Sequence, residues 1–136
     1  MRLRIAHLVL TGFSLFLLWL IWLADTGHGQ FLFHLASRLP AGDKVGHLIL
    51  FGIPSFLLNL ILQARTTRLF GRSVLNGTAV LLALTTLEEC SQLFFKSRTF
   101  DLWDLAAGAL GIWLMGRAAS HYLKWRQRPR ATTELA

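Results

Sequence analysis

The stretch RTFDLWDLAAGALG, residues 98–111, decides how this chain folds. It places one arginine and two aspartates at the start of a segment that continues as an almost wholly apolar run. At helical spacing, Asp101, Asp104, Gly108 and Gly111 share one narrow face. Small residues at this spacing let membrane helices approach closely. We therefore expect the two aspartates to point into a helix bundle and not toward lipid.

Hydropathy predicts four membrane-spanning helices. The chain is 54% hydrophobic and only 15% charged, and a helix that crosses a bilayer needs roughly 20 apolar residues. The apolar stretches of this kind are residues 5–24, 45–62, 74–95 and 102 to about 123. We expect an all-α membrane protein in which residues 1–125 form a single four-helix transmembrane domain. Residues 126–136 are predicted to be a short cytoplasmic tail, and residues 30–39 a short helix in the membrane interface.

The distribution of charge predicts the orientation of these spans. Basic residues are concentrated on the cytoplasmic side of membrane proteins. With the N-terminus inside, the cytoplasmic segments carry a net charge of +9 and the outer segments −2, which together give the +7 of the whole chain. Both termini are then cytoplasmic. Membrane lipids with anionic headgroups are sufficient partners for the arginines, and we expect no nucleic-acid partner.

Polar residues of three predicted helices converge near the outer interface. In the third helix, Thr78, Thr85, Glu89, Gln92 and Lys96 form one polar stripe, from which Glu88 is displaced by about 100°. The second and fourth helices place further charged residues at the same height. The converging residues are Asp43, Lys44, His47, Glu89, Gln92, Lys96, Arg98, Asp101 and Asp104.

Such a cluster has either a functional or a purely structural explanation. A charged side chain at the middle of a membrane helix costs about 2.5 to 3.5 kcal/mol, and ionisable groups there usually serve a function. The alternative is that these residues form interhelical ion pairs and helix caps, since acids at a helix N-terminus are stabilised by the helix dipole. We favour the functional explanation for the cluster as a whole.

Three sequence blocks carry most of these residues: DKVGHLILF (43–51), EECSQ (88–92) and the stretch at 98–111. Together they resemble the VanZ-like family of bacterial membrane proteins, whose pattern reads D-K-x-x-H, E-x-x-Q and R-x-x-D-x-x-D. The resemblance covers about residues 40–115. The matching positions are Asp43, Lys44, His47, Glu89, Gln92, Arg98, Asp101, Asp104 and Gly111. Gly108 departs from the pattern, because the family often has asparagine there.

The resemblance implies a small multi-pass protein of the bacterial cytoplasmic (inner) membrane that acts in the cell envelope. The family is named for a member linked to low-level resistance to the glycopeptide antibiotic teicoplanin. It implies no particular reaction.

The first functional hypothesis is the binding of a lipid-linked cell-wall precursor or another anionic envelope molecule. Lys44, His47 and Arg98 would hold phosphate, and Arg98 can do so with two parallel hydrogen bonds. The ligand-binding residues would be Asp43, Lys44, His47, Glu89, Gln92, Arg98, Asp101 and Asp104.

The second hypothesis is an enzyme that modifies a lipid or a peptidoglycan intermediate. His47, one turn from Asp43, could be a general base, and Glu89 in a poorly solvated site a general acid. Asp101 and Asp104 are the other catalytic candidates. No nucleophilic serine or cysteine and no phosphatase motif accompanies them, which favours binding over catalysis.

Two further alternatives stay open. His47, Glu89, Asp101 and Asp104 are a nitrogen and oxygen ligand set that suits a metal ion, but no HxxxH or CxxC spacing supports one, and the sequence specifies no cofactor. The chain could also be a scaffold that forms a homo-oligomer or joins other envelope proteins through its helix faces.

Overall fold

The computed structural model describes residues 3–29, 31, 34, 41–95 and 101–127. These residues form a mostly α structure with four long helices, α1 (Leu3–Asp25), α3 (Gly42–Ile61), α4 (Asn76–Ser91) and α5 (Leu102–Arg126). A 3-10 turn, η1 (Gln92–Phe94), extends α4. Most of residues 30–39, predicted as an interfacial helix, and residues 128–136 of the predicted tail lie outside the described residues. Because α5 continues through Arg126, the helix includes the first residue of that tail.

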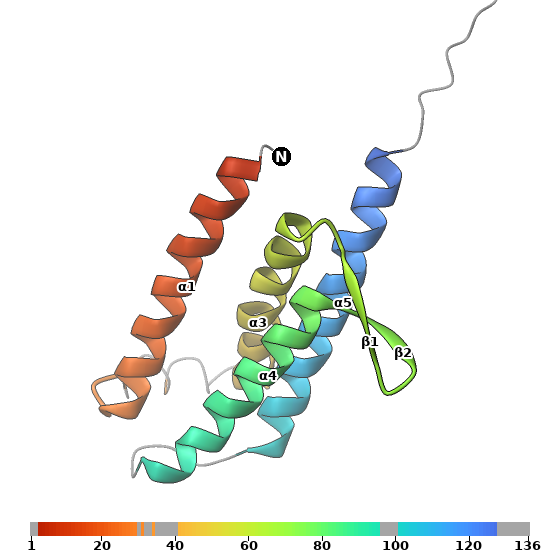
Figure 1. The fold of residues 1–136 in the computed structure, drawn as a ribbon. Helices are drawn as coiled ribbons and strands as arrows, with labels where there is room; N and C mark the ends of the chain where they lie inside the picture. The colour runs from red at the N-terminus through yellow and green to blue at the C-terminus, as the bar shows by residue number, and fades with distance from the viewer. Residues whose placement is uncertain (1–2, 30, 32–33, 35–40, 96–100, 128–136) are drawn as a thin grey trace, which may run out of the picture.

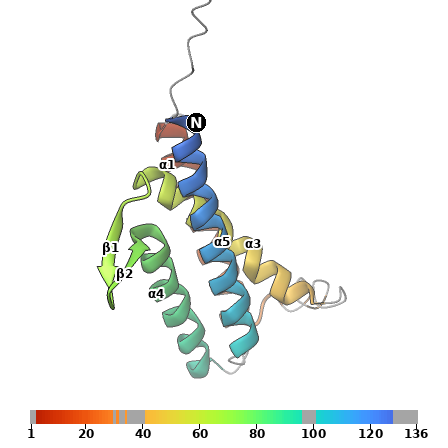
Figure 2. The same cartoon turned by 90° about the vertical axis from the view of Figure 1, so that its right-hand side faces the viewer.

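Helices α3 and α5 are the centre of the bundle, and they run parallel to each other. Lys44 lies beside Asp104 at one end, and Leu60 packs with Leu123 at the other. Helix α4 contacts both, and α1 packs on α3 (Figures 1 and 2). The start of α1 and the end of α5 lie at the same end of the molecule (Figure 1). Successive helices therefore alternate in direction.

A close approach between α3 and α5 depends on Gly111. A Cβ atom added at this position would meet the backbone of Leu48 at 2.9 Å or less. Real Cβ atoms do not come this close to backbone, so any side chain here would push the two helices apart. The predicted role of the glycine face of α5 in helix packing is confirmed.

The described residues combine a partly polar interior with many exposed large apolar side chains. The buried polar residues are Ser55, Asn59, Thr78, Thr85, Glu89 and Gln92. Large apolar side chains such as Leu8, Leu87 and Trp103 are at least 66% exposed. Among the described residues, α1 and α3 are long and apolar enough to cross a membrane. Helix α4, with 16 residues, is shorter than a typical span.

A β-hairpin corrects the prediction of an all-α chain. Strands β1 (Thr66–Leu69) and β2 (Arg72–Leu75) pair antiparallel, with Leu69 opposite Arg72. Phe70 and Gly71 connect them with φ angles of 50° and 76°, as a two-residue type I′ turn requires. The helix predicted to begin at residue 74 begins only at Asn76, because residues 74 and 75 belong to β2.

Candidate functional site

The Lys44 ammonium lies among three carboxylates at one end of the bundle. Its Nζ donates to Oδ2 of Asp43 at 2.9 Å and to Oδ1 of Asp104 at 3.3 Å, and lies 3.5 Å from Oδ2 of Asp101. Asp43 and Lys44 come from the first turn of α3, while Asp101 and Asp104 come from the start of α5. The structure thus brings together residues about 60 positions apart, as the sequence predicted. We call Asp43, Lys44, Asp101 and Asp104 the carboxylate cluster.

Asp101 links the carboxylate cluster to α4. Its Oδ1 accepts a hydrogen bond from the backbone N–H of Trp103 at 2.8 Å and so caps α5. Its own backbone N–H donates to Oε1 of Glu89 at 3.1 Å. One residue therefore caps a helix, approaches the Lys44 ammonium and connects two helices.

Glu89 is the most deeply buried acid of the site. It is 1% exposed, and its two oxygens accept from two different donors, the backbone of Asp101 and the side-chain amide of Gln92 at 3.0 Å. The Gln92 amide also lies 3.3 Å from Oε1 of Glu88, which is less buried. The structure therefore places Glu89, and not Glu88, on the face of α4 that points into the bundle. Among the described residues of the predicted polar stripe, Thr78, Thr85, Glu89 and Gln92 are buried.

The contacts of His47 differ from the pairing with Asp43 that the sequence suggested. Its Nδ1 lies 3.0 Å from the backbone carbonyl of Asp43, which can only accept, so Nδ1 carries the proton. The carboxylate near His47 is that of Asp104, at 4.0 Å, and not that of Asp43. His7 and His121 make the same contact to the carbonyl four residues earlier. The orientation of His47 is thus the ordinary one for a helical histidine, and it gives no special support to a general base.

The acidic side chains offer a set of oxygen atoms, but a cation already lies among them. One oxygen from each of Asp43, Asp101 and Asp104 lies within 4.8 Å of the others. Hard divalent cations prefer such ligands, but a metal ion would have to displace the Lys44 ammonium. Glu89 and His47 do not belong to this oxygen set. The four-residue metal ligand set suggested by the sequence is therefore not brought together.

Two predicted site residues cannot be placed. Arg98 and Lys96 lie outside the described residues, in the connection between η1 and α5. The connection joins two elements that both contribute to the site.

Gly108, the departure from the VanZ-like pattern, lies one helical turn after Asp104 and contacts α3 and α4. A Cβ atom here would lie 3.2 Å from the ring of Phe51 and 3.4 Å from the methyl group of Thr85. The Thr85 hydroxyl is buried and has no hydrogen-bond partner among the described residues. The first carbon of a side chain at position 108 would therefore lie between Phe51 and Thr85.

A second set of buried polar residues, Ser55, Asn59 and Thr78, is not predicted as a cluster from the sequence. The Asn59 amide donates to the Ser55 carbonyl at 2.9 Å and to the Thr78 hydroxyl at 3.2 Å. The Ser55 hydroxyl donates to the Ile112 carbonyl at 2.7 Å and so joins α3 to α5. Both Ser55 and Asn59 are completely buried. Their i, i+4 spacing inside an apolar run could have indicated that this face of α3 points inward.

Comparisons with known proteins give no match: no family model, no curated protein and no solved structure is significantly similar to this chain. The family and the function proposed below are therefore supported by the residues of this chain and by their geometry.

Proposed function

We propose that this chain is a VanZ-like, four-pass protein of the bacterial cytoplasmic membrane that binds the headgroup of a lipid-linked envelope molecule at its outer end. One observation carries the proposal: charged side chains from three helices gather at a single end of a bundle whose exposed surface is largely apolar. In a membrane, such a group is costly unless it is satisfied internally or by a ligand. Both termini are cytoplasmic in this proposal, and the helix directions alternate accordingly.

The charge balance of the site indicates the chemistry of the ligand. Its carboxylates are Asp43, Asp101, Asp104, Glu88 and Glu89, whereas Lys44 is the only lysine or arginine among the described residues of the site. Because Lys44 is already surrounded by carboxylates, a simple anion would have to compete with them. Hydroxyl, amide and ammonium groups can instead donate to these oxygens.

A lipid-linked cell-wall precursor combines both kinds of group. Its sugar and peptide portions carry hydrogen-bond donors for the carboxylates, and its phosphate suits Arg98, which the family resemblance assigns to the site. This combination favours such a precursor over an anionic phospholipid at this end of the molecule. Binding of the precursor would reduce the access of teicoplanin to its target.

The test is a binding titration with the full chain in lipid nanodiscs and a purified lipid-linked precursor. We expect Asp104→Asn to weaken binding about tenfold, since hydrogen bonds to charged groups contribute about 1.5 to 3 kcal/mol. Asp25→Asn is the matched control, because it removes the same group from the end of α1 at the same end of the bundle. Equal affinities for Asp104→Asn and the unmodified chain, or no binding by either, would contradict the proposal.

The resistance part of the proposal has its own test. Expression of the chain in a teicoplanin-susceptible host should raise the inhibitory concentration of teicoplanin. Expression of Asp104→Asn at the same protein level should not. An unchanged inhibitory concentration with the unmodified chain would remove the link to resistance and leave the binding proposal standing on the titration.

A further inference from the structure

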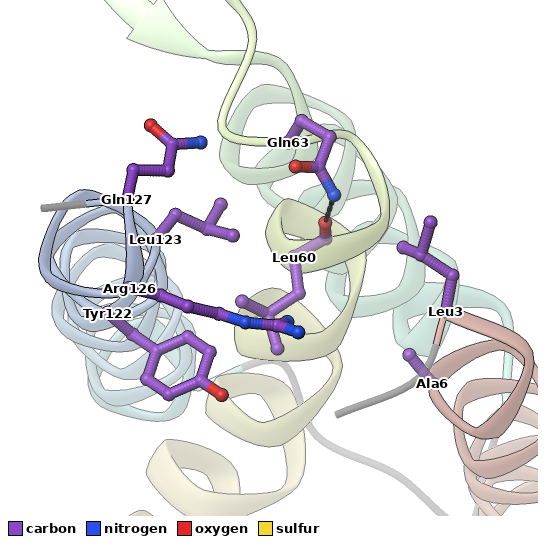
Figure 3. Close-up of a pocket in the computed structure, with 8 residues that line it drawn as sticks. All are labelled: Leu3, Ala6, Leu60, Gln63, Tyr122, Leu123, Arg126 and Gln127. Carbon is purple, nitrogen blue, oxygen red and sulfur yellow. Dashed lines mark hydrogen bonds between the residues drawn. The ribbon is translucent and has the colours of Figure 1, made fainter. Parts of the chain in front are cut away.

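A pocket of about 530 Å³ lies at the end of the bundle opposite the carboxylate cluster. Three helices form it, and Figure 3 shows the residues that line it. Leu3 and Ala6 of α1 form one wall, and Leu60 of α3 and Leu123 of α5 form another. These walls are apolar, and Ala6 is the one residue of α1 that is buried.

A single cationic side chain spans this apolar pocket. Arg126, in the last turn of α5, extends across the pocket toward Leu60 (Figure 3). Within the described part of the chain, no ion pair involves Arg126. The acidic side chains of the described residues are all at the opposite end of the bundle. The guanidinium therefore has its hydrogen-bond donors available for an anion from outside the protein.

We infer that this pocket binds one anionic phospholipid. The phosphate accepts hydrogen bonds from the Arg126 guanidinium, which suits the two-pronged geometry of phosphate recognition. One acyl chain lies against Leu3, Ala6 and Leu60. Tyr122, with an apolar ring and a polar hydroxyl, lines the pocket beside Arg126 (Figure 3) and suits the boundary between headgroup and hydrocarbon.

The apolar walls favour a lipid over a free phosphate, because a small anion would make no contact with Leu3, which lines the pocket and is 51% exposed. The weak attachment of α1 leaves room for the acyl chain, since α1 packs mainly on α3 and buries only one residue. The inference shares the membrane location with the proposed function but concerns the other end of the molecule.

The experiment is native mass spectrometry of the full chain released from micelles that contain equal amounts of phosphatidylglycerol and phosphatidylcholine. We expect one phosphatidylglycerol to be retained in preference to phosphatidylcholine. Arg126→Gln should weaken this retention about fivefold, from the contribution of about 1 kcal/mol that a basic residue makes near an anionic membrane surface. Lys124→Gln is the matched control, because it removes one positive charge from the same end of α5 but from a residue that does not line the pocket.

Three outcomes would overturn the inference. They are equal retention of the two lipids, equal loss in Arg126→Gln and Lys124→Gln, and release of phosphatidylglycerol by inorganic phosphate. The second outcome would indicate diffuse surface attraction, and the third a site for phosphate without an acyl chain. Asp104→Asn should retain phosphatidylglycerol normally, so failure of this inference and failure of the proposed function are distinguishable.

Discussion

Glu89 joins two helices through a single buried carboxylate. Its oxygens accept from the backbone of Asp101 and from the side chain of Gln92, and no other acid of the site is equally buried. In the low dielectric of a bundle interior, a donor that loses such an acceptor keeps its full desolvation penalty. The residue therefore has a structural role in addition to any contact with a ligand.

We expect Glu89→Ala to lower the free energy of unfolding by about 1 to 3 kcal/mol for each buried donor that it leaves without a partner. Thr86→Ala is the control, because Thr86 is an exposed polar residue of the same helix whose hydroxyl bonds only the helix backbone. Reversible unfolding in mixed micelles, followed by circular dichroism, measures both. Equal stabilities of the two variants would show that Glu89 is not held as the structure describes.

Lys44 keeps three mutually repelling carboxylates together. Removing its charge in Lys44→Met should lower the stability of the chain and leave an oxygen site that a divalent cation can fill. Added Ca²⁺ should therefore raise the melting temperature of Lys44→Met but not that of the unmodified chain. At 100 times the dissociation constant the stabilisation is about 2.7 kcal/mol. A melting temperature of Lys44→Met that does not respond to Ca²⁺ would mean that the carboxylates separate once the ammonium is gone.

Helices α3 and α5 pack through backbone contact at Gly111, and this contact sets the distance between their site residues. Gly111→Ala should destabilise the bundle by about 1 to 3 kcal/mol, the usual cost of overpacking, because its Cβ would strike the Leu48 backbone. Gly46→Ala is the same substitution at a helical position where an added Cβ has no atom within 4 Å. It should be neutral or stabilising by up to about 1 kcal/mol. Thermal unfolding in micelles compares the two. A Gly111→Ala variant as stable as Gly46→Ala would contradict the close approach.

Helical periodicity predicted the inward faces of α4 and α5 correctly. Glu89 and Gln92 on one helix, and Asp104 and Gly111 on the other, recur at spacings that only one helix face satisfies, and all four point into the bundle. Such spacing depends only on the residues of one segment, so the inward face of a helix can be predicted without knowing its neighbours.

The features that were missed depend on contacts between segments. The carboxylate of Asp43 pairs with Lys44, so His47 is left with the backbone carbonyl that every helix offers. The turn at Phe70 and Gly71 was obscured because an aromatic residue occupies a position with positive φ, where asparagine or aspartate would have been a clear indication. From hydropathy, the next helix was predicted to begin at Val74. In the structure Val74 pairs with Thr67 in the hairpin.

The acidic residues and most of the basic residues lie on different parts of the molecule. The acids of the described residues lie at the end that carries the carboxylate cluster, while Arg65, Arg68, Arg72 and Arg126 lie on the hairpin side and at the end of α5. The positive-inside tendency then predicts that the hairpin is cytoplasmic.

Labelling of introduced cysteines tests this orientation. In a Cys90→Ala background, which removes the only native cysteine, Thr26→Cys should react with a membrane-impermeant maleimide on intact cells. Thr67→Cys should react only after permeabilisation. Both threonines are exposed in the structure, so they are matched for access. The reverse pattern would invert the predicted topology and place the carboxylate cluster in the cytoplasm.

The single buried residue of α1 has a consequence for how the protein is made. An apolar helix with so little contact to the rest is stable in a bilayer by itself, whereas Asp104 meets Lys44 only when α5 packs on α3, and Glu89 accepts from the Asp101 backbone only when α4 packs on α5. Helix α1 is synthesised before the other three helices, so it can anchor the nascent chain while they assemble as one cooperative unit. Deleting α1 should then reduce the yield of inserted protein more than it disturbs the geometry around Lys44.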